Sequence, residues 1–180
     1  MSRRVLLGVT GSIAAYKAAE LVRLLVRNGD AVTVVMTPAA CEFVRPLTFQ
    51  TLSRNAVYID QFATPAEWKP EHIALAGSVD LAVIAPASAN TIAKLRCGIA
   101  DNLLTAILLA TKAPIAIAPA MNIGMWENPA TQENIAILRG RGVRIIEPTE
   151  GELACGVHGC GRMAEPAEIL SQLETRLPSA

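Results

Sequence analysis

The fold is decided by residues 81–102, LAVIAPASANTIAKLRCGIADN. The apolar run at 81–85 is typical of a strand buried in a parallel sheet, and a turn of small residues, 86–91, separates it from a helical pattern. A turn at the carboxyl end of such a strand presents backbone N–H groups and hydroxyls to the crevice in which α/β sheets bind ligands. Ser88, Asn90 and Thr91 therefore either cap the following helix or form part of a binding site, and this stretch alone leaves both interpretations open.

The same alternation of strand and helix repeats along the chain. Apolar and β-branched runs predict six strands, at residues 5–8, 31–36, 57–59, 81–85, 114–118 and 143–146. Helical patterns lie between most of these runs, and right-handed crossovers then give a doubly wound, mostly parallel sheet. We therefore predict an α/β fold with a six-stranded, Rossmann-like sheet, in a single domain that covers residues 1–180.

The composition excludes several classes of protein. The 16 basic residues balance the 16 acidic ones and aromatic residues make up 4%, so the chain lacks the positive charge and the stacking surface of a nucleic-acid binder. Its apolar runs are broken well before the length that crosses a membrane, and its first residues do not resemble a signal peptide. Its four cysteines are irregularly spaced, unlike a secreted disulfide framework. We expect a cytoplasmic protein with no nucleic-acid or membrane partner.

Turns after other predicted strands also carry candidate binding residues. Gly11 and Ser12 follow the first strand, and Thr37 follows the second. The first turn lacks the GxGxxG pattern, and no acidic residue ends the second strand, so a nicotinamide dinucleotide is disfavoured. Polar turns after strands one, two, four and five meet at one edge of a parallel sheet. The sequence therefore favours a mononucleotide site at that edge.

Other candidate residues lie outside this series of turns. His72 begins a predicted helix, where a single histidine is more often a cap or a surface residue than a catalyst. Residues 147–163, EPTEGELACGVHGCGRM, show neither helical nor strand periodicity, which predicts a functional loop that covers the substrate. This loop holds Cys155, His158 and Cys160, but their spacing is cramped and no fourth ligand is evident, so we expect no metal site. A regulatory Cys155–Cys160 disulfide is a further hypothesis.

Five short motifs together resemble one family. They are GSIAAYK at 11–17, HI at 72–73, PASANT at 86–91, PAMNIGMW at 119–126 and LACG at 153–156. In this order they are similar to the homo-oligomeric flavin-containing cysteine decarboxylases. They look most like the branch of that family that acts on 4′-phosphopantothenoylcysteine in coenzyme A biosynthesis. The match covers essentially the whole chain, and the motifs together are far more specific than any one of them.

The resemblance implies a bound FMN near a subunit contact of a homotrimer, or of a homododecamer built from trimers. The residues that it places against FMN are Gly11, Ser12, Ile13, Thr37, Ser88, Ala89, Asn90, Thr91 and Ala120. It implies that the catalytic residues are His72, Asn122 and Cys155 and that the substrate-binding residues are Asn122, Ala154 and Met163. In that arrangement Asn122 holds the substrate carboxylate or amide, His72 manages protons near the thiol, and Cys155 is the late proton donor.

The implied activity is that of a carboxy-lyase that converts 4′-phosphopantothenoylcysteine to 4′-phosphopantetheine. Oxidation of the CH2–SH group to a thioaldehyde provides an electron sink for the loss of CO2, and the enethiol that results is then reduced. Relatives that decarboxylate the C-terminal cysteine of a peptide stop at the enethiol and lack the equivalent of Cys155, so this cysteine favours the coenzyme A enzyme. A non-catalytic regulatory flavoprotein of the same fold is the other alternative.

The chain departs from the family pattern at a few positions. Relatives usually carry Asp at the position of Val157 and no cysteine at that of Cys160. Many also carry a basic residue shortly after the His72 motif, where this chain does not, and Arg162 or Lys94 are candidates to replace its substrate contact. In many bacteria the family decarboxylase is fused to a phosphopantothenoylcysteine synthetase. The sequence therefore leaves open a stand-alone enzyme or one half of a bifunctional protein.

Overall fold

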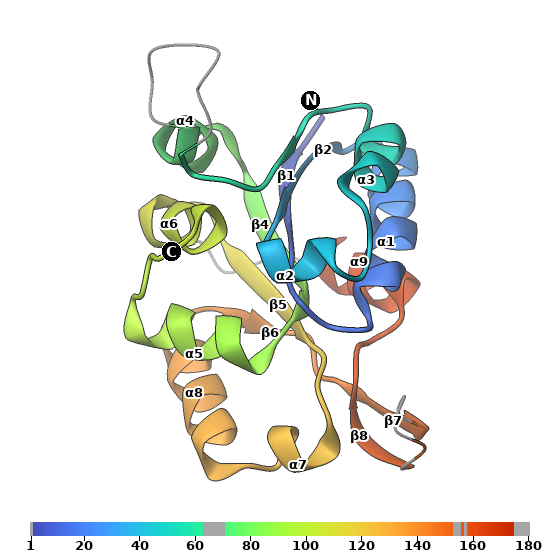
Figure 1. Ribbon diagram of the computed structural model, residues 1–180, viewed down its shortest axis with the longest axis vertical. Coiled ribbons are helices and arrows are strands. Elements are labelled where there is room, and N and C mark those ends of the chain that lie inside the picture. Colours follow the sequence, from blue (N-terminus) through green and yellow to red (C-terminus); the bar gives the residue numbers. More distant parts are fainter. Residues whose placement is uncertain (1, 63–70, 153–155, 157, 175–180) are drawn as a thin grey trace.

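The computed structural model of the chain describes residues 2–62, 71–152, 156 and 158–174. A sheet lies at its centre, with helices on both faces (Figure 1). Its strands are β1 (Arg4–Val9), β2 (Ala31–Met36), β3 (Val57–Tyr58), β4 (Leu81–Ala87), β5 (Ile115–Pro119) and β6 (Arg144–Ile145). Their order across the sheet is β3-β2-β1-β4-β5-β6, and each neighbouring pair is parallel. The predicted α/β fold and its six-stranded, doubly wound sheet are therefore confirmed.

The helices divide between the two faces of the sheet. One face is covered by α1 (Ala15–Arg27), α3 (Pro46–Ser53) and α9 (Pro166–Glu174). The other is covered by α4 (Glu71–Ser78), α5 (Ala89–Cys97), α6 (Leu103–Ala110) and α8 (Pro129–Gly140). Two short helices, α2 (Pro38–Cys41) and α7 (Ile123–Trp126), directly follow the turns after β2 and β5. None of the helices among the described residues has the length and apolarity needed to span a bilayer.

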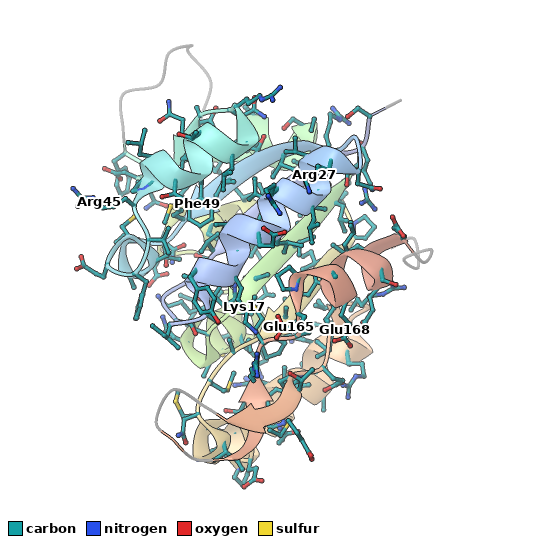
Figure 2. The ribbon with its side chains drawn as sticks, turned by 90° about the vertical axis from the view of Figure 1, so that its right-hand side faces the viewer. Lys17, Arg27, Arg45, Phe49, Glu165 and Glu168 are labelled. Atoms are coloured by element: carbon teal, nitrogen blue, oxygen red, sulfur yellow. The ribbon has the colours of Figure 1, made fainter. Side chains whose placement is uncertain are left out.

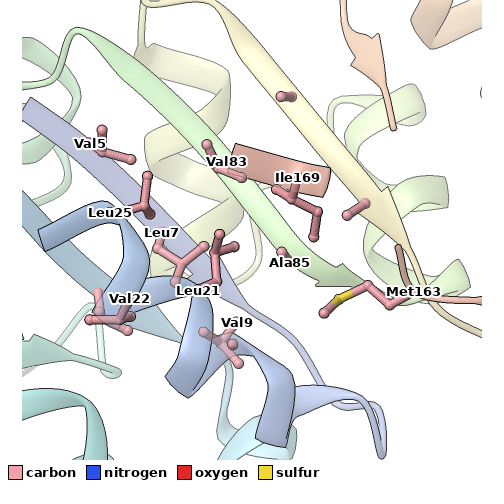
Figure 3. Packing of buried hydrophobic residues seen from close by; sticks show 14 of the residues in the cluster. Val5, Leu7, Val9, Leu21, Val22, Leu25, Val83, Ala85, Met163 and Ile169 are labelled. Carbon is pink, nitrogen blue, oxygen red and sulfur yellow. The ribbon is translucent and has the colours of Figure 1, made fainter. Parts of the chain in front are cut away.

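The alternation of side chains along β1 explains why both faces are apolar. Val5, Leu7 and Val9 belong to the core beneath α1 and α9, whereas Leu6 belongs to the core on the opposite face. Figure 3 shows the first of these cores, in which leucines of α1 pack against β1 and β4. On the other face α6 lies so close to the sheet that a Cβ added at Gly8 would be 2.7 Å from Cδ1 of Leu104. A strand buried on both faces reads as a continuous apolar run, as the sequence does at residues 81–85.

The segment at residues 147–163 differs from the predicted loop. Its described part forms an antiparallel hairpin of β7 (Thr149–Glu152) and β8 (His158–Arg162), which pairs outside the main sheet. The sequence did not indicate a strand here because Gly159 and Gly161 alternate with the other three residues of β8. Few side chains are therefore left to reveal a period of two. Met163, directly after β8, is buried in the core beside Ala85 (Figure 3), so the hairpin is anchored at its base.

Candidate functional site

A cavity of about 650 Å³ opens at the carboxyl ends of β1, β4 and β5, beside β8. This is the edge of a parallel sheet at which α/β proteins bind ligands. The described residues that line it are Gly11, Ser12, Ile13, Ala14, Tyr16, Lys17, Ser88, Ala89, Ala120, Met121, Asn122, Met125, Gly161, Arg162 and Met163. The lining brings together the turns after β1, β4 and β5, which are three of the four polar turns in the predicted series; the turn after β2 is not among these residues.

The turn after β1 forms one wall of this cavity because its residues are small. A Cβ added at Gly11 would lie 2.7 Å from Cβ of Ala39, so only glycine permits the approach of α2. Ser12 Oγ accepts a hydrogen bond of 3.3 Å from the backbone N–H of Ala14 and lies 3.5 Å from the carbonyl oxygen of Ala120. These contacts hold the turn against the end of β5. Ile13, at the rim, is 59% exposed.

A buried hydroxyl joins the ends of β1 and β4. Thr10 is fully buried, and its Oγ1 donates a hydrogen bond of 2.7 Å to the carbonyl oxygen of Pro86. The same Oγ1 accepts a hydrogen bond of 2.9 Å from the backbone N–H of Ser88. One side chain thus fixes the two turns that face each other across the cavity. The role of Thr10 is not evident from the sequence, because its partners lie more than seventy residues away.

We expect Thr10→Val to destabilise the protein and Thr10→Ser to leave it nearly unchanged. Valine has the shape of threonine but leaves the buried Pro86 carbonyl and the Ser88 N–H without this partner, which costs about 1–3 kcal/mol of unfolding free energy. Serine keeps both hydrogen bonds. Urea unfolding of the three proteins measures the difference. A loss in the serine variant with none in the valine variant would show that the methyl group, and not the hydroxyl, matters here.

Two of the predicted residues after β2 and β4, Thr37 and Ser88, are helix N-caps. Ser88 is the N-cap of α5, and its Oγ accepts a hydrogen bond of 3.4 Å from the N–H of Thr91. Ser88 also lines the cavity, so the two interpretations left open by the sequence are compatible. Thr37 caps α2 through the N–H of Ala40. Thr37, Asn90 and Thr91 do not line the cavity, and their predicted contacts with a cofactor remain predictions.

Asn122 lies at the carboxyl end of β5, inside the cavity lining. Its Oδ1 accepts a hydrogen bond of 2.8 Å from the N–H of Gly124, which caps the short helix α7. The neighbouring Met121 donates its N–H to the carbonyl oxygen of Gly161 at 3.0 Å. The hairpin strand β8 therefore packs directly against the backbone that carries Asn122. This contact makes the hairpin one wall of the site.

Two cations and one carboxylate lie beside the cavity. Lys17 is only 7% exposed, and its Nζ is 2.8 Å from Oε1 of Glu165 and 3.3 Å from the carbonyl oxygen of Met163 (Figure 2). Arg162 Nη2 lies 2.9 Å from the same Oε1. The hydrogen bond from Lys17 lowers the pKa of the Glu165 carboxyl below its ordinary value, so this group is ionised at neutral pH. The sequence signal that could have identified Lys17 is its position on the apolar face of the helix, four residues before Leu21.

His72 is not brought to this cavity. It lines a separate pocket of about 460 Å³, together with Gln61, Phe62, Ile73, Ala100, Ala106, Leu109 and Ala110. In Figure 1 its helix, α4, lies at the opposite end of the molecule from α7, which follows Asn122. The structure therefore places two of the predicted catalytic residues on different parts of the surface.

The remaining predictions concern residues 154–160 of the sequence. Ala154 and Cys155 lie outside the described residues. Cys160 is partly buried, its Sγ lies 3.6 Å from the carbonyl oxygen of Pro148, and burial raises the pKa of its thiol. Among the residues that the structure describes, no group of three histidine, cysteine or acidic side chains could hold a metal ion. The proposed Cys155–Cys160 disulfide remains a hypothesis.

Comparison with known proteins identifies the family. A family model described as Flavoprotein matches residues 1–177. The chain belongs to the Flavoprotein family. This flavoprotein is 51% identical over 173 residues to the coenzyme A biosynthesis bifunctional protein CoaBC of Bacillus subtilis, covering 96% of the chain and 43% of that protein. It is 47% identical over 179 residues to the probable phosphopantothenoylcysteine decarboxylase of Streptococcus mutans, covering 98% of the chain and 100% of that protein.

Solved structures agree with this assignment. The flavoprotein superposes on a PPC decarboxylase cysteine-to-serine mutant complexed with pantothenoylaminoethenethiol, with a TM-score of 0.86, 35% identity and coverage of 96% of this chain and 97% of that chain. It also superposes on SpaF, described as an FMN-dependent cysteine decarboxylase, with a TM-score of 0.83, 34% identity and 94% coverage of both chains. The chain thus matches decarboxylases over nearly its whole length, while it spans less than half of the Bacillus subtilis relative.

Proposed function

We propose that this flavoprotein binds FMN and decarboxylates 4′-phosphopantothenoylcysteine to 4′-phosphopantetheine, a cytoplasmic step of coenzyme A biosynthesis. The observation that carries the proposal is the cavity in which the turns after β1, β4 and β5 meet around Asn122. Similarity over the full length of the Streptococcus mutans decarboxylase supports the substrate. A synthetase that supplies this substrate, fused or separate, is a further expectation from the bifunctional Bacillus subtilis relative.

The residues around the cavity fit a flavin mononucleotide. A volume of about 650 Å³ falls in the range of sites for cofactors. Apolar side chains such as Met121 and Met125 suit a planar ring, while the hydroxyls of Ser12 and Ser88 and the N-terminus of α5 suit a phosphate or a ribityl chain. When bound, FMN supplies a two-electron acceptor for the CH2–SH group of the substrate and returns the electrons after CO2 has left.

Asn122 is the residue best placed to orient the substrate carboxylate. It lines the cavity at the end of β5, and its hydrogen bond with the Gly124 N–H fixes the amide group. An amide is neutral, so it can position a carboxylate without the strong stabilisation that a cation would give to the charged ground state. Loss of CO2 removes that charge, and a cation in this position would therefore raise the barrier.

His72 requires a second copy of the chain to act at this site. Its pocket on α4 and α6 is separate from the cavity, and exposed apolar side chains surround it, including Phe62, Ile73 and Leu109. The rim of the cavity is also apolar and exposed at Ile13 and Tyr16. We infer that one copy places the pocket lined by His72 over the cavity of the next copy, in a homotrimer or in a homododecamer built from trimers. Cys155 remains the predicted proton donor.

Incubation of the FMN-loaded protein with 4′-phosphopantothenoylcysteine tests the function directly. Mass spectrometry should find a product lighter by CO2 alone, because the oxidised intermediate is reduced again before release. A product that has lost CO2 and two hydrogens would mean that the reaction stops at the enethiol. Turnover of a peptide with a C-terminal cysteine, and none of the small substrate, would contradict the proposal and favour an activity like that of a peptidyl-cysteine decarboxylase.

A further inference from the structure

The charges that line the cavity are all positive. Among the described lining residues, the ionised side chains are those of Lys17 and Arg162, and no carboxylate is included. The nearby Glu165 holds both cations through one oxygen, Oε1. The three groups together therefore carry one net positive charge at the wall formed by α1 and β8. Such a charge favours an anionic group of the ligand.

The two cations differ in what they can still bind. Lys17 is nearly buried, and its ammonium group is engaged by Glu165 and by the carbonyl oxygen of Met163. Arg162 is 43% exposed, and only its Nη2 is engaged. Its Nε and Nη1 donate no hydrogen bond to any residue that the structure describes. Nη2 also keeps one of its two N–H groups, which forms, together with Nε or with Nη1, an edge that can bind two oxygens of one phosphate.

The position of Arg162 separates it from the turns that suit the cofactor phosphate. Those turns carry Ser12 and Ser88, at the ends of β1 and β4. Arg162 belongs to β8 and follows Gly161, whose carbonyl oxygen accepts the N–H of Met121, next to Asn122. It therefore lies on the side of the cavity proposed for the substrate. Its Nη2 pairs with the Glu165 oxygen that also pairs with Lys17 of α1.

We propose that Arg162 binds the phosphate of the substrate and so selects phosphorylated over unphosphorylated pantothenoylcysteine. This inference rests on the proposed function and adds a specificity residue to it. The carboxylate and the phosphate are the two ends of the substrate, and Asn122 and Arg162 provide one partner for each. Glu165 and Lys17 are positioning residues in this arrangement, because they hold the guanidinium without exhausting its donors.

The test compares two substrates in four proteins, the wild type and three variants. We expect Arg162→Gln to lower kcat/KM for 4′-phosphopantothenoylcysteine by about 10- to 100-fold, the loss of a hydrogen-bonded ion pair. For pantothenoylcysteine, which lacks the phosphate, kcat/KM should change by less than about twofold, since no bond to Arg162 is lost. Arg162→Lys should keep part of the preference. Arg139→Gln, at an exposed arginine paired with Glu147 outside the cavity, is the matched control and should behave as the wild type.

The outcomes separate this inference from the proposed function. If the wild type turns over neither substrate, the proposed function fails, and the role of Arg162 fails with it. If the wild type is active but Arg162→Gln slows both substrates equally, the residue only supports the fold of the hairpin. A weaker Kd for FMN, measured by flavin fluorescence, together with an unchanged preference between substrates would assign Arg162 to the cofactor phosphate. Each of these results overturns the inference.

Discussion

Two inactive variants of this chain should regain activity when they are combined in one oligomer. His72→Asn removes the imidazole, and Asn122→Asp places a negative charge beside the substrate carboxylate while keeping a good helix cap for α7. Each change alone should lower kcat/KM by at least about 100-fold. If His72 of one copy serves the cavity of another, a mixed trimer contains some sites with both native residues. Random mixing in equal amounts should leave about one quarter of all sites intact, which is about one third of the sites in trimers that contain both variants.

The experiment requires co-expression with two affinity tags, so that only mixed oligomers are purified and assayed. Oligomers that carry His72→Asn in both tagged chains form the control and should stay inactive. A failure of the mixed oligomers to exceed that control would mean that His72 and Asn122 do not meet across copies. A molar mass equal to one chain, measured by light scattering, would likewise contradict the proposed assembly, since pocket and cavity lie on different parts of a single copy.

The sheet was predictable because burial on both faces produces an unbroken apolar signal. β4 shows this directly, because all seven of its residues are buried. Its apolar run at 81–85 predicts a strand without reference to any other segment of the chain. The hairpin was not predictable in the same way. Its β8 strand holds two glycines and has no apolar face, and it is kept in place by a contact with Met121, some forty residues earlier. Local patterns carry no information about such a partner.

The residues of the site likewise fall into those with a local sequence signal and those whose partners are distant in the sequence. Ser88 and Asn122 were visible because a polar side chain between a strand and a helix is a local signature of a cap, and both caps line the cavity. Thr10 and the Lys17–Glu165 pair were missed because their partners come from distant segments. The location of His72 away from the cavity depends on how the chain folds across the sheet, and its proposed role depends on a second copy that no single sequence displays.

Gly161→Ala is expected to displace the hairpin from the site and to impair catalysis strongly. Gly161 has a φ of 145°, a conformation that alanine avoids, and an added Cβ would lie 2.4 Å from the backbone oxygen of Met121. Neither the strain, of about 1–3 kcal/mol, nor the clash with backbone can be relieved by rotating a side chain. β8 must then move away from Met121 and Asn122. Because a shift of about 1 Å at a reacting group can cost about 100-fold, we expect a loss of that size in kcat/KM.

Gly159→Ala provides the matched control within the same strand. Its added Cβ would also meet an atom closely, at 2.2 Å, but that atom is Cδ1 of Ile123, the far end of a flexible side chain. The isoleucine can change rotamer, so β8 can keep its contact with Met121 and the loss in kcat/KM should stay below about tenfold. Urea unfolding and kinetics of both variants are compared. Equal effects would show that crowding along β8, and not its backbone contact with the segment carrying Asn122, governs the site.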